Sequence, residues 1–211
     1  MARPTRAAIL ATGALLGALT LAACSNNDSG DMDDMDHGTD QSSTSADTDP
    51  DADFNDADVM FAQMMIPHHQ QAIEMSDILL ANDGAMPEVA SLAEEIKDAQ
   101  APEIDTLTSW LTEWGADPAE EMDHGDMSTD SGMMSEEDLA NLESATGPEV
   151  NRLFLEQMIM HHEGAIAMAQ DQVDNGQNPD AIALAENIIA TQEEEIATMG
   201  SILGTLNDTT H

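Results

Sequence analysis

Hydrophobic and polar residues from about residue 56 onward alternate with the period of amphipathic helices. In the last such stretch, apolar positions recur three and four residues apart, which is typical of a helix with one buried face. These positions are Ile182, Ala185, Ile188, Ile189, Ile196, Met199 and Leu203. No stretch shows the two-residue alternation of a half-buried strand, so the pattern predicts an all-α protein.

Proline and glycine mark the helix ends. Proline is favoured in the first turn of a helix and glycine just after the last. Pro87, Pro148 and Pro179 therefore begin three helices, and Gly84, Gly115 and Gly176 follow the ends of three. The expected helices cover residues 56–82 (or 58–82), 87–114, 148–175 and 179–204.

The first and third of these helices carry the same motif, Phe-x-x-x-Met-Ile-x-His-His-x-x-Ala-Ile-x-Met. It begins at Phe61 and again at Phe154, at a constant offset of 93 residues (61 to 154). The second and fourth helices also share a pattern of isoleucine, glutamine and glutamate. Its two copies are Ile96, Gln100, Glu103 and Ile104, and Ile188, Gln192, Glu195 and Ile196. The repeating unit is therefore a helical hairpin.

Two hairpins predict a four-helix bundle, because short loops join antiparallel neighbours. A long acidic crossover, about residues 116–147, connects them, and residues 135–139 within it are typical of a capped helical turn. One domain is expected over residues 56–207. About 150 residues can bury an adequate core.

The repeated motif is also the candidate metal site. Residues three, four or seven apart share a helix face, so each His-His pair lies beside methionines on one side of its helix. If the two helices face each other, imidazoles and thioethers converge, which suits Cu(I) or Ag(I). Hard cations prefer carboxylates. The candidate ligands are His68, His69, His161, His162, Met65, Met75, Met158 and Met168, with Met64 and Met160 secondary.

Both residue types have ordinary structural roles as well. A methionine stripe usually fills core gaps, and a buried histidine is usually hydrogen-bonded. The joint pattern in both repeats favours a metal role. Adjacent histidines cannot both point inward equally, and the sequence leaves open which one of each pair does.

The first 23 residues are typical of a secretory signal peptide. Arg3 and Arg6 precede an apolar run that is too short and too rich in alanine and glycine for a membrane span. The run ends Leu21-Ala22-Ala23-Cys24, which resembles the bacterial lipobox and implies cleavage before Cys24 and lipidation of its sulfur. Cys24 is the only cysteine, so no disulfide and no thiolate ligand are expected. The mature protein would be exported and lipid-anchored on the outer face of the bacterial cell membrane.

Residues 24–55 are rich in aspartate, serine and threonine, which predicts a disordered acidic tether. The tether and the crossover each contain a short acidic run with methionine and histidine. These runs place Met35 and His37 in the tether, and Met122, His124 and Met127 in the crossover. They resemble the Met-Asp-His-Gly repeats of bacterial copper-resistance proteins. A solubilising acidic linker is the equal alternative.

The chain is strongly acidic, with 43 Asp and Glu residues and a formal net charge of −39. Only Lys97 and Arg152 are basic after Cys24, which excludes nucleic acid as a partner and disfavours docking on anionic lipid. A field of this sign attracts cations. Solubility or adaptation to salt is the simpler reason for most of these acids.

On the repeated motif (residues 65–75 and 154–169) and its partner pattern (96–104 and 192–196), the chain resembles the bacterial domain of unknown function 305 family. Within it, the chain is similar to CopM-like periplasmic copper-binding proteins. The resemblance implies a ferritin-like four-helix bundle and, for characterised relatives, copper and silver binding linked to metal tolerance. The Met-rich crossover and the acidic tether depart from that pattern.

The sequence therefore predicts a lipid-anchored protein, not an enzyme, that sequesters Cu(I) or hands it on to a copper-handling partner, with Ag(I) as the second candidate. A structural or interaction module without metal is the alternative. A di-iron oxidase is a weaker one, because it needs Glu-x-x-His on two helices, and the repeats lack that spacing. No serine or cysteine lies in a sequence context that indicates a catalytic nucleophile.

Overall fold

The computed structural model of the chain describes residues 53–117 and 131–208. These residues all belong to one compact unit, residues 46–211. The predicted signal peptide, Cys24 and most of the tether lie outside the described residues. The acidic runs with Met35 and His37, and with Met122, His124 and Met127, lie outside them as well.

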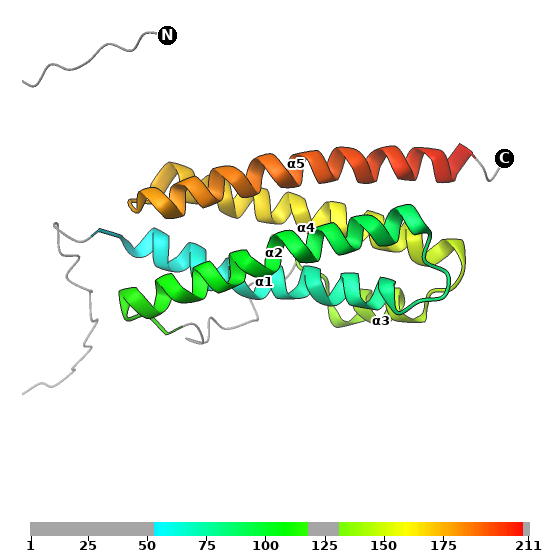
Figure 1. Ribbon diagram of the computed structural model, residues 1–211, viewed down its shortest axis with the longest axis horizontal. Coiled ribbons are helices and arrows are strands. Elements are labelled where there is room, and N and C mark those ends of the chain that lie inside the picture. The colour runs from blue at the N-terminus through cyan, green and yellow to red at the C-terminus, as the bar shows by residue number, and fades with distance from the viewer. Residues whose placement is uncertain (1–52, 118–130, 209–211) are drawn as a thin grey trace, which may run out of the picture. The chain divides into compact units, whose positions relative to one another are not determined.

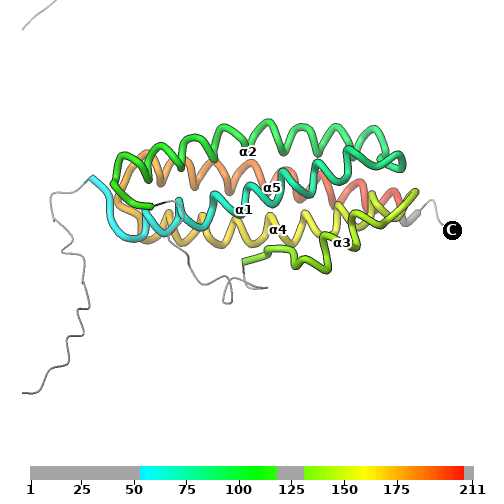
Figure 2. The backbone as a smooth tube through the Cα atoms, turned by 90° about the horizontal axis from the view of Figure 1, so that it is seen from below, coloured from blue at the N-terminus to red at the C-terminus, as the bar shows by residue number. Residues whose placement is uncertain are grey.

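The described residues form five helices and no strand, which confirms the all-α prediction for this part of the chain. The helices are α1 (Asp56–Leu80), α2 (Pro87–Trp114), α3 (Glu136–Ser144), α4 (Pro148–Asn175) and α5 (Pro179–Asp208). The four long helices lie side by side in two perpendicular views (Figures 1 and 2). None of the described helices combines the length and apolarity that a membrane span requires.

Local sequence explains most of the helix ends. The Asn55 side chain caps α1 by accepting from the backbone N–H groups of Ala57 and Asp58. Helices α2, α4 and α5 begin at the expected prolines. Helix α1 ends at Leu80, two residues before the expected Asn82, because the Asn82 side chain bonds across loops to Ala145 O and Gly84 N.

The expected end of the last helix at Gly204 is wrong. Helix α5 continues through Gly204 to Asp208. A glycine inside a helix costs only about 1 kcal/mol relative to alanine. Leu203 and Leu206 on either side pack against the core, and this packing holds the last turns in helical form.

Helix α1 packs along α2, α4 packs along α5, and the two pairs meet through α1 and α4. Figures 1 and 2 show α1 and α4 running in opposite directions. The Asn55 side-chain amide donates to Asn175 O, which ties the start of α1 to the end of α4. This arrangement places the middle of α1, with its histidines, level with the middle of α4.

The crossover contains more structure than the predicted turn. Residues 136–144 form the nine-residue helix α3, capped by the Ser135 and Asp138 side chains. Leu142 of α3 is fully buried, and Gln157 of α4 donates to Asp138 O. Helix α3 therefore packs against both α1 and α4 (Figure 2).

Candidate metal centre

His68 of α1 and His161 of α4 meet face to face in the interior. Their ring centroids are 3.7 Å apart and the rings are tilted by 36°. Both side chains are almost completely buried. The adjoining Ala72 and Ala165 are also buried, and small residues at these positions let the two helices approach closely. His68 and His161 are therefore the two histidines that face the opposite repeat.

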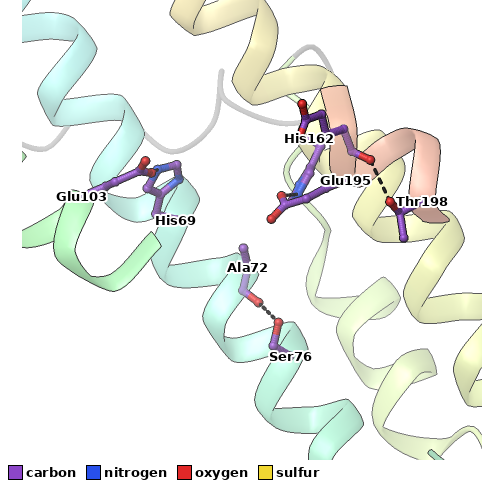
Figure 3. Close-up of polar contacts among 8 residues, drawn as sticks. His69, Ala72, Ser76, Glu103, His162, Glu195 and Thr198 are labelled. Carbon is purple, nitrogen blue, oxygen red and sulfur yellow. Dashed lines mark hydrogen bonds and ion pairs between the residues drawn. The ribbon is translucent and has the colours of Figure 1, made fainter. Parts of the chain in front are cut away.

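The other two histidines point toward their own hairpin partners. His69 Nε2 lies 2.7 Å from Glu103 Oε2 of α2, and His162 Nε2 lies 2.7 Å from Glu195 Oε2 of α5 (Figure 3). Both histidines are fully buried, and both carboxylates are only 14% exposed. The two repeats thus build the same histidine–glutamate pair. Each glutamate orients its imidazole by hydrogen bonding to Nε2.

The Nδ1 atoms of all four histidines are buried and have no hydrogen-bond partner. His161 Nε2 has none either. His68 Nε2 lies 3.0 Å from the Ser131 carbonyl oxygen. Because a carbonyl only accepts, His68 Nε2 carries the proton and His68 Nδ1 holds a free lone pair. A buried nitrogen without a partner is costly, and a metal ion would satisfy such lone pairs.

Burial keeps the two stacked imidazoles neutral. Desolvation, aided by the neighbouring His69, lowers the pKa of His68 from 6.5 to about 3. Desolvation, aided by His68 itself, lowers the pKa of His161 well below 6.5. Neutral imidazole is the form that binds metal ions, so near neutral pH no proton has to leave either ring first.

The methionine candidates divide between the two apolar clusters of the core. Met65 is fully buried in one apolar cluster, against which Met168 packs. Met75 and Met158 are fully buried in the other. Among the secondary candidates, Met64 is partly buried, whereas the Met160 side chain is 50% exposed.

Two hydrogen bonds and one close backbone approach hold the crossover near the histidine pair. The Gln71 side chain donates to Met134 O and accepts from Met134 N. Ser131 and Gly132 cross α4 at Gly164, where a Cβ would lie 1.8 Å from Ser131 O. Only glycine allows that approach, and it brings Ser131 O within reach of His68.

No role was predicted from the sequence for Glu103, Glu195 or Ser131. The two glutamates could have been recognised, since each recurs at the same place in the second repeated pattern. Ser131 carried no comparable signal. In the described ranges, no three His, Cys, Asp or Glu side chains are grouped to hold a metal ion.

The sequence profile of a family described as a domain of unknown function, DUF305, matches residues 58–203. The chain belongs to the DUF305 family. The match spans both histidine pairs and both glutamates that bond to them. No functionally curated protein sequence matches the chain.

Solved DUF305 structures resemble the chain over most of their length. A DUF305 fragment from Deinococcus radiodurans is 33% identical, with a TM-score of 0.66 over 72% of this chain and 97% of that one. A candidate secreted DUF305 protein from Streptomyces coelicolor is 30% identical, with a TM-score of 0.66 over 72% and 92%. CopM in its Cu(I)-bound form is 31% identical, with a TM-score of 0.59 over 70% and 96%. CopM has also been solved with Cu(II) and with Ag.

Proposed function

We propose that this DUF305 protein binds Cu(I), or Ag(I), through imidazole and thioether ligands, and sequesters the ion or hands it on without catalysing a reaction. The His68–His161 pair carries the proposal. The ring centroids of two neutral, buried imidazoles lie 3.7 Å apart, and their Nδ1 atoms have no partner. Such free lone pairs in the interior are suited to a metal ion.

The donor set favours a soft ion. The chain's single cysteine is Cys24, so no thiolate is available within the described residues. Glu103 and Glu195 are occupied by histidines. The remaining donors are imidazole and thioether, which prefer Cu(I) and Ag(I). The proposed ligands come from His68, His69, His161, His162 and the buried Met65, Met75 and Met158. Met168, the eighth predicted ligand, is only partly buried and is left out of this set. The copper- and silver-bound forms of CopM support this choice.

The domain, residues 56–207, is proposed to be a ferritin-like bundle of two repeated hairpins. The paired packing of α1 with α2 and of α4 with α5 supports this description. The equivalent histidine–glutamate pairs support it as well. Each repeat contributes one histidine, His68 or His161, to the proposed centre where α1 and α4 meet.

The protein is proposed to act outside the cytoplasm, anchored by lipid on Cys24. The basic and apolar start and the lipobox-like end of the first 24 residues support export. The candidate secreted relative from Streptomyces coelicolor agrees with it. The acidic runs with His37 and His124 would then collect ions near the domain, because a negative field concentrates cations.

A purely structural role for the histidines is the competing interpretation. The bonds of His69 and His162 to glutamates are compatible with it, but the partnerless nitrogens of His161 are not. A ligand that binds only the folded protein raises its melting temperature. A melting temperature that is unchanged by Cu(I) under reducing conditions would favour the structural role.

The direct test replaces both stacked histidines. We expect His68→Ala with His161→Ala to weaken Cu(I) binding by at least about 100-fold, because ligands matter more than the groups that orient them. Affinity is measured by competition with a Cu(I) chelator, and helicity by circular dichroism. Gln70→Ala with Glu163→Ala is the matched control, since both side chains are exposed beside the same histidine pairs. Unchanged affinity in a helical histidine variant would disprove the assignment.

A further inference from the structure

A second group of thioethers lies toward the amino-terminal end of α1, beginning one turn before His68. Here the groove between α1 and α4 contains a cavity of about 170 Å³ lined by three methionines, Met60, Met64 and Met168. Asp171 and Gln172 also line it. We call this cavity the thioether pocket. Met60 and Met64 lie one turn apart on α1, and Met168 comes from α4, so sulfur ligands enter from both helices.

Core packing does not explain Met60 and Met64, which belong to neither apolar cluster, whereas Met168 packs against one of them. The Met60 side chain is 48% exposed, and Met64 and Met168 are only partly buried. Met65, Met75 and Met158, by contrast, are fully buried in the core. An exposed methionine contributes little hydrophobic stabilisation, because that scales with the area removed from water. Met60 and Met64 therefore have no evident role in the core.

The internal repeat provides a comparison within the same molecule. At the 93-residue offset, Met60 and Met64 correspond to Leu153 and Gln157, and Met168 corresponds to Met75. At that end of the groove α3 closes the surface, and Gln157 donates to Asp138 O of α3. Met75 is fully buried there. The fold therefore covers one of two equivalent sites and leaves open the one that carries three thioethers.

The polar groups of the thioether pocket are suited to a cation. Gln172 is 1% exposed, and its Nε2 donates to Asp58, while its Oε1 is buried without a partner. Asp171 adds a carboxylate, and no lysine or arginine lines the pocket. A volume of about 170 Å³ is below the range of roughly 300–1,000 Å³ for small-molecule sites, but it can hold an ion.

We propose that the thioether pocket is a separate binding site for a soft monovalent cation, Cu(I) or Ag(I), with Met60, Met64 and Met168 as its ligands. Thioether sulfur selects such ions over hard ones. This site goes beyond the proposed function, because Met64 and Met168, which the sequence grouped with the histidines, are here assigned to a separate ion together with Met60. Its exposure makes it accessible to an ion from solution without movement of the core.

Methionine oxidation tests the proposal residue by residue. Met60 and Met160 are nearly equally exposed, at 48% and 50%, so they form a matched pair. The full chain is treated with dilute hydrogen peroxide in chloride-free buffer, with and without saturating Ag(I). Mass spectrometry then follows sulfoxide at each residue. A sulfur bound to Ag(I) is shielded, so we expect Met60 oxidation to slow by roughly tenfold and Met160 oxidation to stay unchanged.

Two variants complete the test. Met168→Leu keeps an apolar side chain of similar volume but removes one ligand, so we expect Ag(I) to lose its protection of Met60. His68→Ala with His161→Ala should leave that protection intact. The proposal is overturned if Ag(I) protects Met60 no more than Met160, if protection persists in Met168→Leu, or if it disappears in the histidine variant. If Ag(I) protects Met60 and the histidine variant keeps its Cu(I) affinity, the thioether pocket is supported. The histidine centre is then refuted.

Discussion

At the scale of the residue, burial makes His68 a pH-sensitive element of the metal-free protein. The His68 pKa is about 3 in the folded chain and 6.5 as a free side chain, so the unfolded chain binds more protons between these values. The contribution of His68 to the free energy of unfolding is therefore fully present above pH 6.5, and it is lost as the pH falls toward 3. The loss is about 1.4 kcal/mol per pH unit for this histidine. His161, whose pKa is also lowered, acts in the same direction.

Chemical denaturation between pH 7 and pH 5 measures this slope. The many carboxylates also respond to pH, so the comparison is with His68→Gln/His161→Gln, which keeps them unchanged. We expect the variant to lose less stability than the wild type over the same interval. Equal slopes would show that neither imidazole is held neutral by burial.

Glu103 is predicted to stabilise the apo fold through His69. Glu103→Ala leaves the buried Nε2 of His69 without its acceptor, which should lower the free energy of unfolding by about 1–3 kcal/mol. Urea denaturation of the metal-free protein measures this loss of stability. Glu94→Ala on the same helix is the control, because Glu94 is exposed. A loss no greater than that of the control would contradict a role for the histidine–glutamate pair.

The sequence predicted which residue types gather, but not how each histidine is oriented. The helical repeat placed His68 and His69 about 100° apart, and either could have faced the opposite repeat. The choice depends on how α1 packs against α4, where His68 meets His161, and this is a tertiary feature. The acceptor Ser131 lies 63 residues from His68, and no local pattern connects them.

At the scale of the element, glycine lets the crossover reach the histidine pair. Gly164→Ala places a methyl group 1.8 Å from Ser131 O, so the Ser131–Gly132 backbone must move and its bond to His68 is lost. We expect a lower melting temperature despite the higher helix propensity of alanine. Gly200→Ala in α5 is the control, because its Cβ meets nothing within 4 Å. It should stabilise by about 0.5–1 kcal/mol. If both variants stabilise alike, the close approach at Gly164 is unimportant.

Helix starts were predictable because proline and capping residues act locally. Helix ends were less so. Helix α5 passes through Gly204, because core packing of Leu203 and Leu206 outweighs the small penalty of one glycine. Helix α3 has nine residues, and only its capping residues Ser135 and Asp138 were evident in advance. Its length depends on Leu142 reaching the core.

At the scale of the whole molecule, a net charge of −39 opposes compact folding. Repulsion between exposed carboxylates is screened by salt, with a Debye length of about 10 Å at 0.1 M. We expect the melting temperature of the metal-free protein to rise by several degrees between 0.05 M and 0.5 M NaCl. KCl should act equally, because screening depends on ionic strength. A melting temperature that falls with salt would show that attractive ion pairs dominate instead.

X-ray absorption at the copper edge tests the central claim most directly. The full chain is loaded with one equivalent of Cu(I) under reducing conditions, and the nearest scatterers are identified. We expect both sulfur and imidazole nitrogen around the ion, with the imidazole signal lost in His68→Ala/His161→Ala. Sulfur or oxygen scatterers alone, identical in that variant, would place the copper outside the histidine centre and contradict the proposed function.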